Sequence, residues 1–245
     1  HQNWKNYIPP EPELKGIRIF DNYALDELTN YFDWTPFFTT WELRGKYPSI
    51  LEDDKYGNEA TKLFKDAKQL LNEIVKNKLL NANAVVHIFP ALSVGDDVEI
   101  YDLNEDAIAQ VHCLRQQIKK ADYQFCLSDF IAPKDSGKQD WLGAFAVTTG
   151  IGLNKIVEEF EANDDDYNAI MAKALADRLA EAFAEKLHEL TRKQYWGYAT
   201  EENLSLENVL KEKYYGIRPA PGYPACPDHS EKEILFKLLN AEVNT

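Results

Sequence analysis

The chain has 245 residues with a formal net charge of −14; 44% of the residues are hydrophobic and 12% are aromatic. This length suits one large domain with a sizeable buried core, and the composition is ordinary for a globular protein. The negative charge argues against nucleic acid as a partner, because phosphates require a basic footprint. No apolar run approaches the ~20 residues that span a bilayer, so no membrane segment is predicted. The three cysteines are scattered and odd in number, which indicates a reducing, cytoplasmic location without disulfide bonds.

The beginning of the chain predicts a polar arm followed by helices. Residues 1–20 are polar and contain several prolines, and they predict no regular element. After Asp21, a candidate N-cap, three apolar residues recur at helical spacing: Leu25, Leu28 and Phe32. Residues 58–78 predict a long amphipathic helix, because Ala, Leu, Phe, Ile and Val share one face while Lys and Asp occupy the other.

Strands are predicted in the middle of the chain. An apolar run at 84–89 ends at Pro90, and residues 97–101 alternate charged and apolar side chains. Further strands are expected at 112–115, 124–127 and 141–147. The polar segment 133–139, which contains Gly137, predicts a loop.

Helical periodicity returns at residues 166–195, where apolar side chains step mostly by four. At about 100° per residue, Asp177, Glu181 and Glu185 fall on the opposite side of this helix. The simplest interpretation of these acidic residues is a solvated face.

The C-terminal part predicts a shorter helix at 205–214 and a last one at 231–243, where Ser230 and Glu233 resemble a capping box. Strands in the middle with long helices around them predict an α+β fold. We therefore expect a single domain with a curved, mostly antiparallel sheet.

The segment from Arg218 to His229 is the most distinctive stretch, since it holds four of the 11 prolines. Each proline fixes its own φ, lacks an N–H, and pushes the preceding residue toward extended backbone. Gly222 is the one flexible point. The segment is therefore stiff and rich in carbonyls, and it holds the Arg218 cation and the Tyr223 ring at a fixed separation.

Three interpretations of this segment are open. It could be a rigid surface connection. It could be a metal site, although Cys226 and His229 alone are too few ligands for a closed zinc site. It could also be a small-molecule cradle in which an arginine binds a carboxylate, carbonyls bind an amine edge and a tyrosine faces a cation.

The proline-rich segment resembles the signature of the S-adenosylmethionine-binding activation domain of cobalamin-dependent methionine synthase. The resemblance runs from about residue 4 to the end, and the motifs follow in the order of that family: 33–38 with 45–48, 114–117, 127–133, 141–147 and 165–189. It implies the α+β architecture expected above, with residues 1–245 as one activation domain.

The resemblance also implies a set of site residues. Asp33 matches the acid that holds the amino group of S-adenosylmethionine, and Arg218 matches the arginine that binds its carboxylate. The other ligand-side positions are Glu181, Ala220, whose backbone meets the adenine edge, Gly222 and Tyr223. Two residues, Lys46 and Asp177, match positions on the rim that faces the cobalamin domain. No residue resembles a catalytic acid, base, nucleophile or metal ligand.

The function implied by the resemblance is reactivation of the enzyme. Oxidised cobalamin, held by a neighbouring domain of the same enzyme, is reduced by one electron and methylated by S-adenosylmethionine. The expected partners are that cobalamin-binding domain and a flavodoxin-like or flavoprotein reductant.

One departure from the family concerns the C-terminus. The family continues past the last helix into a segment that also touches S-adenosylmethionine, whereas this sequence stops at Thr245. This leaves two hypotheses: a methyl-donor domain that binds S-adenosylmethionine, or a non-catalytic module that docks on the cobalamin and flavodoxin-type domains. The intact segment from Arg218 to Tyr223, together with Asp33, favours the first.

Overall fold

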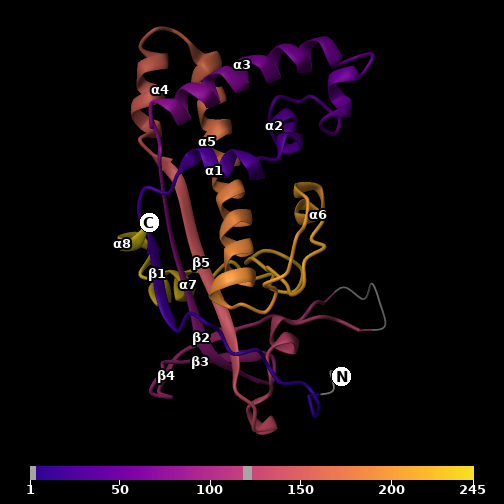
Figure 1. The fold of residues 1–245 in the computed structure, drawn as a ribbon, viewed down its shortest axis with the longest axis vertical. Coiled ribbons are helices and arrows are strands. Elements are labelled where there is room, and N and C mark those ends of the chain that lie inside the picture. Colours follow the sequence, from indigo (N-terminus) through magenta and orange to yellow (C-terminus); the bar gives the residue numbers. More distant parts are fainter. Residues whose placement is uncertain (1–3, 118–122) are drawn as a thin grey trace.

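The structure, a computed structural model, describes residues 4–117 and 123–245 and shows an elongated α+β domain (Figure 1). The first residues of the N-terminal arm lie outside the described residues. The strands are β1 Gly16–Phe20, β2 Asn81–Val94, β3 Asp97–Tyr101, β4 Ala107–His112 and β5 Asp140–Ile151. The α-helices are α1 Leu25–Leu28, α2 Trp34–Thr40, α3 Gly57–Lys76, α4 Leu153–Glu161, α5 Asp166–Leu190, α6 Leu206–Leu210, α7 Lys232–Leu239 and α8 Ala241–Asn244.

The sheet is built on two long antiparallel strands, β2 and β5, which pair from Asn81 opposite Ile151 to Ala91 opposite Asp140. Strand β1 pairs with β2 along residues 84–88, and β3 and β4 extend the sheet from the far end of β2. All of these strand pairs are antiparallel, which confirms the predicted fold class. Strand β2 does not end at Pro90 as predicted, because Pro90 lies within the strand opposite Trp141.

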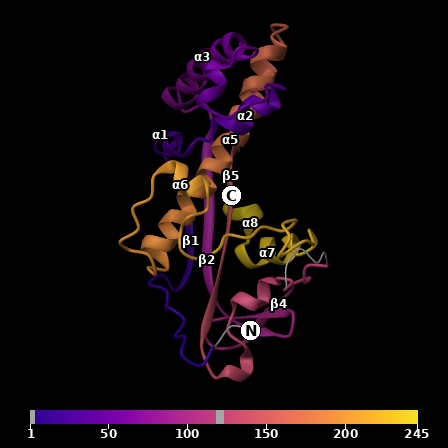
Figure 2. The same ribbon diagram turned by 90° about the vertical axis from the view of Figure 1, so that its right-hand side faces the viewer.

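Alternate residues of β2 face two different hydrophobic cores. Ala84 and Val86 belong to a first core with α3 and α5, whereas Val85 and Phe89 belong to a second core with α7 and α8. Figure 2 shows α5 and α7 on opposite sides of the long strands. Because side chains alternate along a strand, a strand buried on both faces appears in the sequence as a continuous apolar run.

The two long predicted helices are confirmed as α3 and α5. Helix α5 begins where the Asp165 side chain accepts a hydrogen bond from the Asn168 N–H at 3.0 Å, and it ends in a π-helical turn, Thr191–Tyr195. Leu175, Leu179 and Phe183 are fully buried along its inner face. The helix runs along β5, and this contact carries the apolar stripe that the sequence shows.

Two predicted strands are wrong or shifted. Residues 124–127 do not form a strand; instead Leu127–Phe130 form a 3₁₀ turn, because the Asp129 carboxylate accepts from the Cys126 N–H at 2.9 Å. This local side-chain bond offers the backbone an alternative to a ladder. The strand expected at 112–115 is β4, which lies earlier and ends at His112.

Other differences involve helix ends and short elements. Helix α1 has Ala24 at its N-cap rather than Asp21, and α7 begins after Glu231 without a side-chain cap from Ser230. The predicted last helix is divided at Asn240, which has a left-handed φ of 46°. Helix α4 and the edge strand β1 were not predicted.

Candidate functional site

The proline-rich segment begins at α5, where Arg218 contacts Glu185, and forms a compact turn that leads to α7 (Figure 2). The Gly222 N–H donates to the Cys226 carbonyl at 2.8 Å, and the Cys226 N–H donates to the Tyr223 carbonyl at 2.9 Å. Gly222 has a φ of +103°, and a Cβ there would lie 2.6 Å from atoms of the His229 ring. The predicted need for glycine at this position is therefore conformational and steric. Tyr223 is 62% exposed, so its ring is available to a ligand.

Arg218, at the start of the segment, is anchored to α5 by Glu185. Its Nη2 lies 2.5 Å from Oε1 of Glu185. Arg218 Nε and Glu185 Oε2 are buried without a hydrogen-bond partner, so each of the two groups keeps unused bonding capacity. The sequence placed Glu185 on a solvated face, but this residue is only 8% exposed, because Arg218 and Tyr214 lie against that end of α5. Burial raises the pKa of Glu185, and the charge of Arg218 opposes that rise.

A buried polar network lies directly behind this ion pair. Arg192 is fully buried; it binds Glu202 through Nε at 3.1 Å and Nδ1 of His188 through Nη1 at 2.8 Å. The guanidinium also stands 4.3 Å from the centre of the Tyr214 ring. Burial, together with the charges of Arg192 and Arg218, lowers the pKa of His188 to about 3. His188 is therefore neutral at ordinary pH and accepts from Arg192.

Sequence reasoning did not identify this network as part of the site. The sequence shows only two polar residues of the network, Glu185 and His188, within the helical segment that carries the apolar stripe. Each of them alone is compatible with a solvent-exposed position. Their burial depends on Tyr214 and Glu202, which follow α5 in the chain and pack back on it.

Asp33 lies on a separate element, at the start of α2. Its carboxylate accepts a hydrogen bond from the Thr35 N–H at 2.9 Å and thereby caps the helix. Thr35 Oγ1 in turn accepts from the Tyr47 N–H at 3.2 Å, so the segments 33–38 and 45–48, the first of the motifs shared with the family, are joined. Among the described residues, no hydrogen bond or ion pair joins Asp33 to Arg218; both carboxylate and guanidinium retain capacity for a ligand.

The other predicted site residues are exposed. Asp177 and Glu181 lie on successive turns of α5 above Glu185, and Asp177 pairs with Arg178 at 2.6 Å. Glu181 lies one turn before Glu185 on α5, and its charge contributes to the raised pKa of Glu185. Lys46 is exposed on the loop after α2, and Ala220 is exposed at the turn. The structure thus places Arg218 against α5, the helix that carries Glu181, and places Ala220, Gly222 and Tyr223 on the turn that follows Arg218. Asp33 and Lys46 lie on either side of α2 in the chain.

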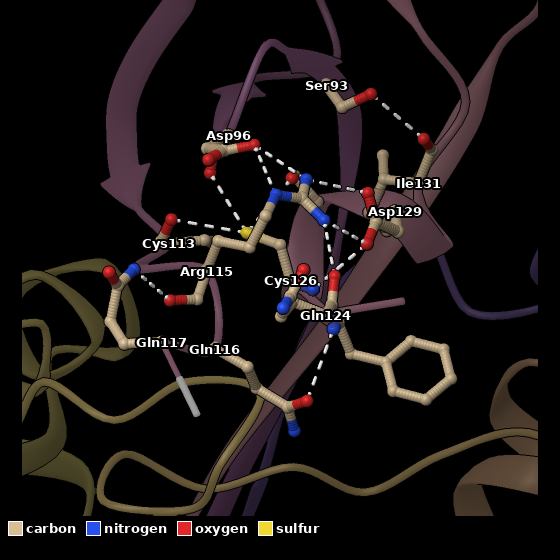
Figure 3. Close-up of polar contacts among 12 residues, drawn as sticks. Ser93, Asp96, Cys113, Arg115, Gln116, Gln117, Gln124, Cys126, Asp129 and Ile131 are labelled. Carbon is tan, nitrogen blue, oxygen red and sulfur yellow. Dashed lines mark hydrogen bonds and ion pairs between the residues drawn. The ribbon is translucent and has the colours of Figure 1, made fainter. Parts of the chain in front are cut away.

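A second anchor holds the far end of the turn, next to the pair of Arg115 and Asp129 that Figure 3 shows. The Leu127 N–H donates to the Ala225 carbonyl at 3.1 Å. Leu127 begins the 3₁₀ turn whose Asp129 carboxylate receives two bonds from Arg115, at 2.6 and 2.8 Å. The turn is therefore attached at Arg218 to the first core and at Ala225 to the second.

The described residues contain no group of three or more His, Cys, Asp or Glu side chains arranged to hold a metal ion. Cys113, Cys126 and Cys226 are buried free thiols. Burial raises the pKa of Cys113 to about 12, and this thiol is therefore protonated. The absence of a zinc site at Cys226 and His229 remains a prediction.

Known proteins define the class of this domain. The sequence profile described as "Vitamin B12 dependent methionine synthase, activation domain" matches residues 24–245, and the chain belongs to this family. It is thus a domain of a methyltransferase that uses cobalamin, and the cobalamin sits in another domain of that enzyme. The resemblance found in the sequence is confirmed.

A particular solved structure is very similar. A crystal structure described as the MetH reactivation domain bound to AdoHcy has 54% sequence identity and a TM-score of 0.95. The match covers 100% of this chain and 76% of that chain. In the described part of the chain, no helix is both long and apolar enough to cross a bilayer.

Proposed function

We propose that this domain binds S-adenosylmethionine between the Arg218 turn and α2 and presents its methyl group to cobalamin, reactivating methionine synthase. The observation that carries the proposal is the half-satisfied pair of Arg218 and Glu185 beside a stiff, carbonyl-rich turn. A buried guanidinium nitrogen without a partner is costly unless a ligand or a shift of the side chain satisfies it. A small zwitterion carrying a carboxylate would supply that acceptor.

Each predicted ligand residue has a role that suits its chemistry. Arg218 offers a planar fork to the carboxylate of the ligand, and Glu185 limits the rotamers that this fork can take. Asp33 and Glu181 are the acids placed for the ammonium group. The backbone of Ala220 meets the adenine edge, Gly222 allows the close approach, and the exposed Tyr223 ring lies beside the sulfonium.

The residues of this domain position the ligand and perform no proton transfer. S-adenosylmethionine, when bound, supplies an electrophilic methyl group to the reduced cobalt of cobalamin, whose own nucleophilicity makes a protein nucleophile unnecessary. The contribution of the domain is therefore orientation and charge complementarity. Arg218 neutralises the carboxylate, and the acids on α5 and α2 neutralise the ammonium.

The partners follow from the same assignment. The domain interacts with the other domains of the same enzyme. Exposed Lys46 and Asp177 are proposed to form the rim that docks on the cobalamin-binding domain, and a flavodoxin-like or flavoprotein partner is proposed to supply the electron. Charged residues at such a rim affect the rate of encounter more than the final affinity.

Calorimetry with S-adenosylmethionine on the 245-residue chain tests the proposal. Arg218→Ala should weaken binding roughly ten- to a hundredfold, because a charge-assisted bond contributes about 1.5–3 kcal/mol. The same variant should lose little affinity for the decarboxylated analogue. Asp33→Asn should weaken the binding of S-adenosylmethionine and of the decarboxylated analogue alike, because Asp33 is proposed to contact the amino group, which both ligands carry. Arg18→Ala on the exposed edge strand is the control and should change neither affinity.

Two results would contradict these roles. If Arg218→Ala weakened the binding of S-adenosylmethionine and of the decarboxylated analogue equally, Arg218 would only stabilise the turn. Failure of the unmodified chain to bind S-adenosylmethionine, with retained binding to the cobalamin domain, would favour the docking-module function instead.

A further inference from the structure

The turn that presents Ala220, Gly222 and Tyr223 depends on one contact for its far end. Within the described part of the chain, the Leu127 N–H to Ala225 carbonyl bond of 3.1 Å is the backbone hydrogen bond that joins residues 219–228 to a distant segment. The other backbone hydrogen bonds of this segment are internal to it. The Leu127 N–H is therefore the backbone donor that fixes the far end of the turn relative to the sheet, where the Cys226 side chain is also buried.

That N–H is oriented by a short 3₁₀ turn with its own support. Asp129 accepts from the Cys126 N–H at 2.9 Å and thus fixes the residue immediately before Leu127. Both oxygens of Asp129 bind Arg115, through Nη1 at 2.6 Å and Nη2 at 2.8 Å. A bidentate pair of this kind defines an orientation as well as a distance.

Arg115 has no bonding capacity left over. Its remaining donors bind Asp96 through Nε at 3.1 Å and Nη2 at 2.6 Å, and the Gln124 carbonyl through Nη1 at 2.9 Å. Because a guanidinium has five N–H groups, these bonds and the two to Asp129 use all of them. Figure 3 shows the guanidinium between Asp96 and Asp129. A lysine has three donors and no fork, so it cannot reproduce this arrangement.

We propose that Arg115 is a positioning residue for the turn of residues 219–228, and that it acts through Asp129 and the Leu127–Ala225 hydrogen bond. Arg115 touches no ligand in this assignment; it fixes the 3₁₀ turn, and the 3₁₀ turn fixes Ala225. The inference deepens the proposed function and rests on it for the identity of the ligand.

The first test removes the connecting hydrogen bond alone. Leu127 is the first residue of its 3₁₀ turn, a position that tolerates proline. The preceding Cys126 is already extended, with φ −129° and ψ 148°, as a residue before proline must be. Leu127→Pro deletes the N–H, and Leu127→Ala is the matched control for the lost side chain. Relative to Leu127→Ala, Leu127→Pro should weaken S-adenosylmethionine binding about three- to tenfold. Equal affinities would overturn the proposal.

The second test asks whether Arg115 acts through that bond. Arg115→Lys should weaken binding about three- to tenfold by itself, and it should add nothing in the Leu127→Pro background. Lys134→Gln breaks an ion pair of 2.6 Å with Glu99 in the same part of the domain, and it should leave affinity unchanged. Additive losses from Arg115→Lys and Leu127→Pro would show that the arginine does not act through Ala225.

A ligand-free measurement separates this inference from the proposed function. Amide hydrogen exchange at Gly222 and Cys226, whose N–H groups close the turn, should accelerate in Arg115→Lys and Leu127→Pro but not in Lys134→Gln. If the unmodified chain fails to bind S-adenosylmethionine, the ligand assignment fails while the exchange rates still decide the role of Arg115. Unchanged exchange in both variants would overturn that role.

Discussion

Two arginines support the same turn from opposite ends, and their surroundings differ. Arg192 is fully buried behind Glu185 and Arg218, with Glu202 and His188 as partners. The Arg115 side chain is 33% exposed, although all of its donors are used. A buried charge that loses its partner is expensive, whereas an exposed ion pair contributes little to stability. The Arg192 network should therefore determine the stability of the fold, whereas the Arg115 network should determine the position of the turn.

The largest effect should follow removal of the buried charge. Arg192→Ala leaves Glu202 and His188 without their partner, so the free energy of unfolding should fall by about 3–5 kcal/mol. Chemical denaturation measures this change. The double variant Arg192→Met with Glu202→Leu should recover part of the loss, because it removes both charges from the interior. A single Arg192→Ala loss below about 1 kcal/mol, the range of surface pairs, would break the comparison.

Acidification should reveal the neutral His188. Its pKa is lowered to about 3 in the fold, so the unfolded state binds the proton first as the pH falls below about 6.5. Stability contributed by neutral His188 is present at pH 7 and is lost toward lower pH. The difference in unfolding free energy between the unmodified chain and His188→Asn should therefore shrink by about 2 kcal/mol between pH 7 and pH 5. A pH-independent difference would mean that His188 is not buried as a neutral ring.

The turn itself should be sensitive to one added methyl group. Gly222→Ala adds a Cβ at a φ of +103° and against the His229 ring, and should cost about 1–2 kcal/mol of stability. Adding His229→Ala removes the steric part and should restore some of it. Gly16→Ala, at a similar φ of +114° with no atom within 4 Å of the added Cβ, measures backbone strain without a steric contact. Equal losses at Gly222 and Gly16 would exclude a role for the ring contact.

The smallest stability effect should come from the second arginine. Arg115→Lys should change the free energy of unfolding by less than about 1 kcal/mol, since the pair is partly exposed and screened. Denaturant titration at two salt concentrations checks this expectation. A loss of unfolding free energy comparable to that of Arg192→Ala would mean that the Arg115 network also stabilises the fold.

The features predictable from sequence were those encoded by local periodicity. Helices α3 and α5 and the core of β2 and β5 follow from apolar spacing, and the freedom of Gly222 to take an unusual φ follows from its missing Cβ. The edge strand β1 was missed because it has only 5 residues, Gly16–Phe20, in which the alternation of Ile17, Arg18 and Ile19 is too short to stand out. The strand expected at 124–127 failed because one carboxylate, Asp129, redirected the backbone.

The sequence indicated residues of the candidate site but not the buried residues that hold them in place. Arg218, Gly222 and Tyr223 stand out within a short segment. Glu185 and Arg192 do not, because their burial arises when residues ten or more positions later fold back over α5. Helical spacing describes one element, and it cannot show which exposed-looking face another element will cover.

The attachment of the turn to both hydrophobic cores has a consequence for cooperativity. Arg218 is fixed through Glu185 to the core that α5 and α3 share, while Ala225 is fixed through Leu127 to the core beneath α7. A ligand that needs both attachments binds only when both cores are formed. Each molecule of ligand therefore opposes partial unfolding of either core, and thermal melting should sharpen toward one transition as ligand concentration rises.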